Sequence, residues 1–428
     1  MGCALSILAL AAMLGDPDAD LRAAVLLPSP EERRAAAAAL AARADVPLER
    51  WLELCRSFGT FDAPPPGVSS ARAPLWTPEG LEETELFVYV PSAYDPAVPA
   101  PLLLQMHWTS GSGEGQHELW HGVADALGML VLAPSEPGPN EGYTFSERER
   151  QATLSALRWA RLRFNVDENR IFASGISRGA HLAWDLALRH PDLFAGLAPM
   201  IGSPRIAIDK GENNVRYLEN LVGLPIRDLQ GEQDDPVVVH DVKRAFALLA
   251  GWKAPDAKLV LFPELGHWFE LDAVDWNAFW SSCRRDPLPL RVVRRAARPG
   301  EGRAFWLDVL ETDPAAVQEV FVPRVSKGTY ERLEPLALLD FLQGEVDERT
   351  ARVEATRTAT RIKLEARHAT RVRVLLSEEL LPAKPEVLLQ WDQKTVRRKV
   401  ERSAAVLLGE FVERFDRAFL PVFEARLP

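Results

Sequence analysis

The sequence is poor in cysteine and has no cluster of cysteine and histidine with the spacing of a metal site. Its three cysteines, Cys3, Cys55 and Cys283, include no CxxC pair, which argues against the common zinc and dithiol motifs. If Cys3 leaves with a signal peptide, Cys55 and Cys283 could form one disulfide, but two separate thiols are the favoured interpretation. The sequence implies neither a metal ion nor an organic cofactor.

An excess of positive charge is also missing. The 428 residues carry a formal net charge of −11, which argues against a basic face for nucleic-acid phosphates and gives no support for docking on an anionic membrane. Long apolar runs are equally scarce, because Cys3–Leu14 is shorter than the roughly 20 apolar residues that span a bilayer. We therefore expect neither nucleic-acid binding nor stable membrane insertion. The oligomeric state is left open.

The run Cys3–Leu14 has the length of the apolar region of a signal peptide. No lysine or arginine precedes it, but Ala11 and Ala12 offer small residues near a cleavage zone. We interpret residues 1–15 as a signal peptide and favour an exported protein, periplasmic or secreted, over a cytoplasmic one. The first six residues also fit a myristoylation pattern. That alternative is not favoured, because an apolar run follows instead of a solvated tail.

Changes in composition and in the pattern of apolar residues divide the rest of the chain into three parts. Residues 16–75 are expected to form a short helical lead-in followed by a proline-rich linker. Residues 76–286 alternate apolar strands with helices, which predicts an α/β fold with a mostly parallel sheet covered by helices on both faces. Residues 287–428 contain segments that alternate apolar and charged residues, and we expect a β-rich accessory domain with a C-terminal helix.

Four local signals sharpen this outline. Ser29 precedes proline and two glutamates, as a helix cap does. Ser146 and Glu149 have the spacing of a capping box. Residues 319–322 are predicted to form one strand of the C-terminal part, and residues 404–418 its final helix.

One motif in the alternating region points to chemistry. The sequence Gly175-Ile176-Ser177-Arg178-Gly179 fits GxSxG and lies between a predicted strand and a predicted helix. This is the setting of a nucleophile elbow, a turn so tight that side chains two residues before and after the serine would clash. The backbone N–H of Arg178 would then point at an oxyanion from a helix N-terminus. The alternative is a serine that only caps a helix between two turn glycines.

A serine hydroxyl needs a base within hydrogen-bond reach and an acid that orients the base. His267 follows a predicted strand and fits the role of base better than the other seven of the eight histidines. Asp234 and Asp235 compete for the role of acid in the turn after the strand 225–229. Because Asp235 precedes a proline and resembles a helix cap, Asp234 is preferred. The chain order Ser177, Asp234, His267 is that of α/β-hydrolases.

The loop after the predicted strand 102–106 is expected to supply a second oxyanion donor. The backbone N–H of Trp108 or Thr109 is the candidate, and His107 could brace this loop or line the substrate pocket. Trp108 and Trp268 flank the predicted catalytic loops. They form an apolar or aromatic acyl pocket in one interpretation and are packing residues in the other.

These residues resemble a known family. Residues from about 81 to 283 resemble α/β-hydrolases of the dienelactone hydrolase, prolyl-oligopeptidase-like and polyhydroxybutyrate-depolymerase-like esterase group. The matching pieces are Phe87-Val88-Tyr89-Val90-Pro91, His107-Trp108-Thr109, Gly175–Gly179, Gly231-Glu232-Gln233-Asp234 and Gly266-His267. The resemblance implies a triad of Ser177, Asp234 and His267, with Trp108 and Arg178 as oxyanion donors. Residues 361–400 are similar to a β-rich extension found on some bacterial members.

Two departures from the family bear on substrate. The oxyanion loop reads His-Trp-Thr where many relatives have His-Gly, and the bulky tryptophan narrows the site. The nucleophile is serine rather than the cysteine of dienelactone hydrolases, which argues against that activity. The sequence thus predicts a serine hydrolase that cleaves a small-molecule or polysaccharide-linked carboxylic ester through an acyl-enzyme. The alternatives are a prolyl-oligopeptidase-like peptidase and an inactive homologue that binds carbohydrate or a surface.

Overall fold

The computed structural model describes residues 15–77, 80–136, 141–206, 213–298, 300–359, 361–382 and 386–428. The apolar run Cys3–Leu14, on which the signal-peptide prediction depends, lies outside these ranges. Within them, no helix combines the length and the apolar character needed to cross a membrane.

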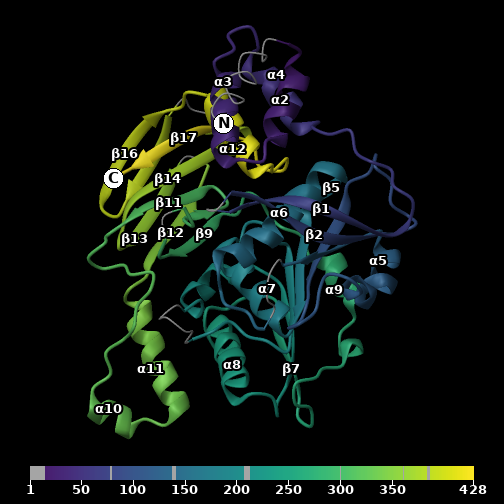
Figure 1. Cartoon of the computed structure of the whole chain (residues 1–428). Helices are drawn as coiled ribbons and strands as arrows, with labels where there is room; N and C mark the ends of the chain where they lie inside the picture. The colour runs from purple at the N-terminus through teal and green to yellow at the C-terminus, as the bar shows by residue number, and fades with distance from the viewer. Residues whose placement is uncertain are drawn as a thin grey trace.

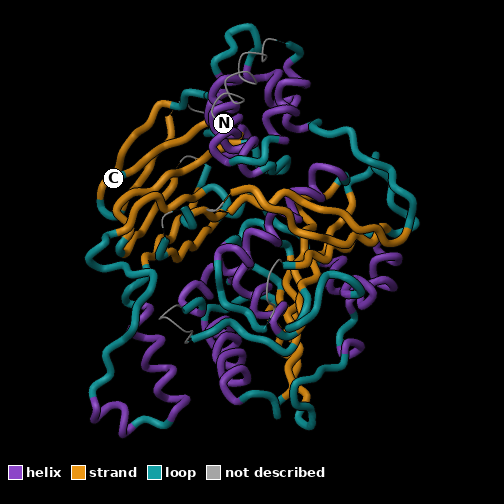
Figure 2. The backbone as a smooth tube through the Cα atoms, in the orientation of Figure 1, coloured by secondary structure: helices purple, strands orange, loops and turns teal. Residues whose placement is uncertain are grey.

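An eight-stranded sheet forms the centre of the molecule (Figures 1 and 2). Its strands are β1 (Gly67–Thr77), β2 (Gly80–Val90), β3 (Ala100–Met106), β4 (Leu130–Ser135), β5 (Val166–Ile176), β6 (Gly196–Met200), β7 (Ile226–Gly231) and β8 (Ala257–Phe262). They lie in the order β1-β2-β4-β3-β5-β6-β7-β8. The pairs β1–β2 and β2–β4 are antiparallel, and every other pair is parallel. The predicted mostly parallel sheet is confirmed.

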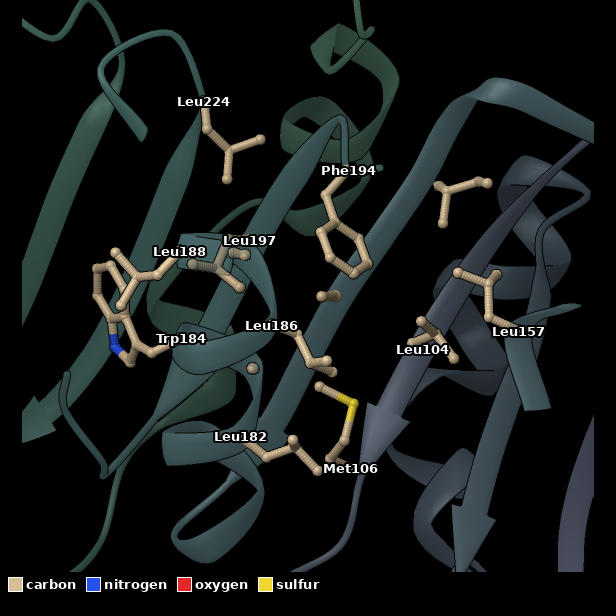
Figure 3. Packing of buried hydrophobic residues seen from close by; sticks show 14 of the residues in the cluster. Leu104, Met106, Leu157, Leu182, Trp184, Leu186, Leu188, Phe194, Leu197 and Leu224 are labelled. Atoms are coloured by element: carbon tan, nitrogen blue, oxygen red, sulfur yellow. The ribbon is translucent and has the colours of Figure 1, made fainter. Parts of the chain in front are cut away.

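Helices cover both faces of this sheet. They are α5 (His121–Leu127), α6 (Glu147–Arg163), α7 (Arg178–Arg189), α8 (Pro236–Gly251) and α9 (Trp276–Ser282), with short 3₁₀ turns at η1 (Gln116–Trp120), η3 (Val215–Leu221) and η4 (Leu271–Ala273). Because side chains alternate along a strand, Leu104 and Met106 of β3 face α6 and α7 in one apolar cluster (Figure 3). Leu103 faces the opposite cluster, which contains Trp120 and Trp280.

Two predicted helix starts are confirmed. Ser29 accepts a hydrogen bond from the backbone N–H of Glu32 and begins α3 (Pro30–Ala41). Ser146 and Glu149 form the capping box at the start of α6. Each satisfies backbone N–H groups that the first helical turn would leave without an acceptor.

The linker predicted to end at residue 75 is wrong in its second half. Residues 67–77 form β1, the edge strand of the central sheet. The sequence obscures this because the first part of β1 is largely exposed, and only Ala73, Leu75 and Thr77 alternate into a buried face. Pairing along the whole length of β2, rather than burial, holds this strand in place.

The C-terminal part contains two further sheets that pack face to face, as expected for a β-rich region. The strands are β9 (Arg291–Ala296), β10 (Arg303–Ala304), β11 (Leu307–Thr312), β12 (Ala351–Arg357), β13 (Arg361–Arg367), β14 (Ala369–Ser377), β15 (Glu386–Trp391), β16 (Lys394–Lys399) and β17 (Pro421–Leu427). One sheet has the order β10-β11-β14-β17 and the other β16-β15-β13-β12-β9. Their inward side chains share one apolar cluster, which includes Trp306, Val353 and Val374.

Two predictions for this part need correction. Residues 319–322 form no strand, because Val320 and Val322 are exposed and Pro323 has no N–H to donate to a ladder. The helices α10 (Lys327–Arg332) and α11 (Pro335–Asp347) follow instead. The predicted helix over residues 404–418 is shorter: α12 (Ala404–Arg414) ends where Phe415 takes a left-handed φ of 51°. It is followed by β17 rather than being the final element.

The N-terminal helices share a core with α12. They are α2 (Pro17–Leu26), α3 and α4 (Leu48–Arg56), and they lie beside α12 at the top of Figure 1. Leu40, Trp51 and Cys55 are buried there against Leu408 and Phe411. Cys55 and Cys283 are both free thiols in separate apolar clusters, in agreement with the favoured interpretation.

A buried ion pair joins the segment between α12 and β17 to the central sheet. Both terminal nitrogens of Arg285 bind Asp416, at 2.8 and 3.0 Å, and its Nε donates to Asn169 Oδ1 at 3.0 Å. Burial raises the pKa of Asp416, but the charge of Arg285 outweighs this effect and brings that pKa to about 2. The pair is therefore ionised at neutral pH.

We predict that Arg285→Met lowers the free energy of unfolding by about 3–5 kcal/mol, because it leaves Asp416 as a buried charge without its partner. The matched control is Arg397→Met, whose side chain is 75% exposed and whose contact with Glu386 is 3.9 Å long; such surface pairs contribute little. Urea unfolding measures both variants, as a shift of the midpoint at constant slope. Equal losses in the two would contradict the prediction.

Candidate active site

The loops after β5, β7 and β8 bring Ser177, Asp234 and His267 together. Ser177 Oγ lies 2.8 Å from His267 Nε2, and His267 Nδ1 lies 2.9 Å from Asp234 Oδ2. With the proton on Nδ1, the ring donates to Asp234 while Nε2 accepts the hydroxyl proton of Ser177. Such a series can take up a proton as the hydroxyl oxygen attacks a carbonyl carbon. All three residues follow the carboxyl ends of parallel strands, where α/β sheets bind ligands.

Ser177 occupies a strained turn between β5 and α7. Its φ of 55° and ψ of −112° are unfavourable for a residue with a side chain. Its N–H donates to Met200 O at 2.8 Å, and its carbonyl accepts from Ala180 at 2.9 Å. A Cβ at Gly175 would collide with the backbone of Gly179, and a Cβ at Gly179 with the carbonyl of Met106. The two glycines of the motif are therefore required by close backbone approach.

The turn after β7 separates the two candidate acids. Asp235 accepts a hydrogen bond from Val237 N–H at 2.8 Å and caps α8. Asp234 receives its neighbour's N–H at 2.7 Å on Oδ1 and the Gln230 amide at 2.8 Å on Oδ2. These donors fix the carboxylate toward His267. The geometry thus brings Asp234, and not Asp235, to His267.

Backbone contacts also hold the acid turn against the loop of His267. The N–H of Gln233 donates to Leu265 O at 2.9 Å. A Cβ at Gly231 would overlap the carbonyls of Leu265 and Gly266, so only glycine allows the approach. The result is a nearly buried Asp234, 7% exposed in its side chain, beside a His267 that is 53% exposed. The imidazole is open to a substrate while its acid is shielded.

His181 is a second histidine near this site. Burial lowers the pKa of His181 to about 4, so the ring is neutral at pH 7. Its Nδ1 lies 2.7 Å from the carbonyl of Ser203. His181 is thereby occupied by the backbone, and the contact with Ser177 Oγ belongs to His267.

The residues of the predicted oxyanion loop take different positions. Trp108 and Thr109 are exposed after β3, and Trp108 is 45% exposed. Trp268, next to His267, is 66% exposed. His107 is fully buried, so its predicted place in the substrate pocket is wrong. Its ring nitrogens instead contact the Trp108 carbonyl and the carboxylate of Glu136, in agreement with a bracing role.

Arg178 is placed by its side chain as well as by the helix that it begins. Its guanidinium is buried and binds Glu136 at 2.9 Å and Glu149 at 2.8 Å. The sequence pattern does not single out Glu136. The signal that was available is the arginine itself: an arginine beside Ser177, at the start of a buried helix, requires carboxylate partners.

Among the described residues, no group of three or more histidine, cysteine, aspartate or glutamate side chains is arranged to hold a metal ion.

No protein-family model matches the chain. Feruloyl esterase C of Emericella nidulans is 27% identical over 142 residues, 31% of this chain and 52% of that protein. Acetylxylan esterase A of Aspergillus oryzae is 24% identical over 136 residues, which are 28% of this chain and 42% of that protein. Poly(3-hydroxyalkanoate) depolymerase C of Paucimonas lemoignei is 25% identical over 132 residues, 28% and 31% of the two chains. The chain therefore spans between 31% and 52% of the length of these relatives.

The solved structure of a thermostable esterase aligns with 50% of this chain and 58% of the esterase chain, at 22% sequence identity and a TM-score of 0.39. The curated relatives confirm the predicted resemblance to esterases. The strand order β1-β2-β4-β3-β5-β6-β7-β8 and the helices on both faces of the sheet give the chain the predicted α/β-hydrolase fold.

Proposed function

We propose that this protein is a serine hydrolase that cleaves carboxylic esters through an acyl-enzyme on Ser177. The observation that carries the proposal is the hydrogen-bonded series from Ser177 Oγ through His267 to Asp234. The names of the curated relatives, which are esterases and a polyester depolymerase, support an ester as substrate. The apolar run Cys3–Leu14 supports the further proposal that the protein is exported.

The steps follow from the positions of the side chains. Ser177 Oγ attacks the ester carbonyl while His267 Nε2 takes the hydroxyl proton, and Asp234 stabilises the imidazolium that forms. The backbone N–H groups of Arg178 and of Trp108 or Thr109 are proposed to bind the oxyanion. His267 then gives its proton to the leaving alkoxide. Water, deprotonated by the same nitrogen, releases the acid from Ser177 and restores the hydroxyl.

The surroundings of Ser177 bear on the substrate class. Trp108 and Trp268 present exposed indoles on the loops that follow β3 and β8, and exposed indoles can stack on planar or cyclic groups. We propose that the two rings flank an apolar or aromatic part of the substrate. A small-molecule ester and an ester linked to a polysaccharide both fit this arrangement.

The proposed chemistry is tested with a panel of aryl esters, acetylated and feruloylated sugars, and peptides. We expect turnover of esters, and a fall in kcat of roughly 10⁴-fold or more for Ser177→Ala, because no other group replaces the nucleophile. Fluorophosphonate should label the wild type and leave the variant unlabelled. Full ester activity in Ser177→Ala would contradict the proposal, and faster cleavage of peptides than of esters would favour a peptidase.

The two neighbouring aspartates provide a matched pair. We expect Asp234→Asn to lower kcat by about 10³–10⁴-fold, because the amide no longer holds His267 in the tautomer that can accept a proton. Asp235→Asn should retain kcat within about twofold, since asparagine caps a helix as well as aspartate does. Steady-state ester hydrolysis measures both. The reverse ranking would assign the acid to Asp235.

The role of the indole at Trp108 is tested by substrate preference. If Trp108 contacts the acyl group, Trp108→Ala should lower kcat/KM for a naphthoate ester relative to an acetate ester by about tenfold or more, since buried aromatic contact is lost. Trp268→Ala in parallel shows whether the second indole shares this contact. An unchanged ratio in Trp108→Ala would reject the pocket role and leave a packing residue.

A further inference from the structure

One buried carboxylate joins the two loops that carry the proposed oxyanion donors. Glu136 directly follows β4, the neighbour of β3 in the sheet. Its Oε2 lies 2.9 Å from Nη1 of Arg178 and also contacts Nε2 of His107. The backbone N–H of Glu136 points at that same ring nitrogen from 3.4 Å. A single oxygen thus bridges the residue after β3 and the residue after Ser177.

On the side of β3, the bridge continues to the backbone of Trp108. His107 is fully buried, and its Nδ1 lies 2.8 Å from the carbonyl oxygen of Trp108. The N–H of Gly111 donates to the same oxygen at 3.1 Å. These contacts restrict the rotation of the Trp108 backbone, although its indole is exposed. Because a peptide unit is planar, this carbonyl fixes the N–H of Thr109, whose direction therefore depends on the ring of His107.

On the side of the nucleophile, the guanidinium of Arg178 is fixed at all three nitrogens. Besides the contact with Glu136, Nη2 binds Glu149 Oε1 at 2.8 Å and Nε donates to Gly142 O at 3.1 Å. Glu149 is itself held in the capping box of α6. The side chain of Arg178 thus anchors the first residue of α7, whose backbone N–H is the other proposed donor.

The electrostatics favour a charged Glu136. Burial raises the pKa of Glu136, but the hydrogen bond and charge of His107 and the charge of Arg178 together lower it below its usual range. Its Oε1 is buried and, among the described residues, has no hydrogen-bond partner. A buried carboxylate with one unsatisfied oxygen costs stability.

The geometry points to Glu136 as a positioning residue of the oxyanion hole, which sets the backbone N–H groups of Thr109 and Arg178 at the spacing that one oxyanion requires. Glu136 touches no substrate in this role, because its side chain is 2% exposed, and it acts through His107 and Arg178. The role rests on the proposed function, since it needs a reaction that develops an oxyanion at Ser177.

The test compares Glu136→Gln with Glu168→Gln. Glu168 is a matched control because its side chain is 4% exposed and pairs with Arg161 and Arg417, away from Ser177. With p-nitrophenyl acetate, we expect Glu136→Gln to lower kcat by about tenfold or more with KM changed less than about threefold, since the donors serve the transition state. Glu168→Gln should retain kcat within about twofold, even if its midpoint of urea unfolding falls as far as that of Glu136→Gln.

A second readout separates positioning from a structural effect. An aryl trifluoromethyl ketone forms a hemiketal oxyanion on the serine, so its inhibition constant should rise in Glu136→Gln by the same factor as kcat/KM falls. Should Glu136→Gln fail to fold, Arg178→Lys keeps the charge but cannot bridge Glu136 and Glu149, and should show the same proportionality. Retained kcat in the folded variant, or an inhibition constant that does not change, would overturn the role of Glu136.

These outcomes are distinct from failure of the proposed function. The proposed reaction itself would be contradicted by a wild type without ester turnover or by an active Ser177→Ala. Only the positioning role would be contradicted if the wild type is active, Ser177→Ala is inactive and Glu136→Gln is unaffected.

Discussion

Close contact between backbones at the carboxyl edge of the central sheet is the constraint on which the site depends. The turn at Ser177 leaves no room for a Cβ at Gly175 or Gly179, and the acid turn leaves none at Gly231. Gly179 lies against the carbonyl of Met106, so the helix after Ser177 contacts the strand that leads to Trp108. Side chains contribute the chemistry, but the distances between them are set by carbonyls in direct contact.

Polar side chains then fix what the backbone brings together. Gln230 and the N–H of Asp235 orient Asp234, while Glu136 and Glu149 hold Arg178. These partners are shielded from solvent, whereas His267 and the indoles of Trp108 and Trp268 are exposed. In the proposed reaction, partners that are already oriented would limit the reorganisation of polar groups as charge develops on the substrate oxygen.

The sequence was sufficient wherever a signal is local. The capping box at Ser146, the GxSxG turn and the Asp-Pro helix start at Asp235 each depend on residues within one turn of each other. Their structures follow from short-range sterics and from unsatisfied N–H groups. The choice of Asp234 over Asp235 followed because the capping role had already been assigned to Asp235.

What the sequence did not reveal depends on distant partners. β1 is a strand because it pairs with β2, although its own burial pattern is weak. Glu136 becomes informative only when β4 and β3 lie side by side and His107 and Arg178 meet it. Residues 319–322 have the composition of a strand but pair with no strand in the described part of the chain. Local composition cannot report on any of these pairings.

The shared core of the N-terminal helices and α12 has a consequence for the order of folding. Arg33 and Glu413, which lie on the two sides of this core, are 380 residues apart in sequence. Leu40 and Trp51 therefore lack their contacts with α12 until the segment around Phe411 has been synthesised. Contacts of such long sequence separation form late and carry a high entropic cost of loop closure. The α/β core can form before this unit closes, so the apolar faces of the N-terminal helices stay partly exposed on the unfinished chain, where a chaperone can bind them.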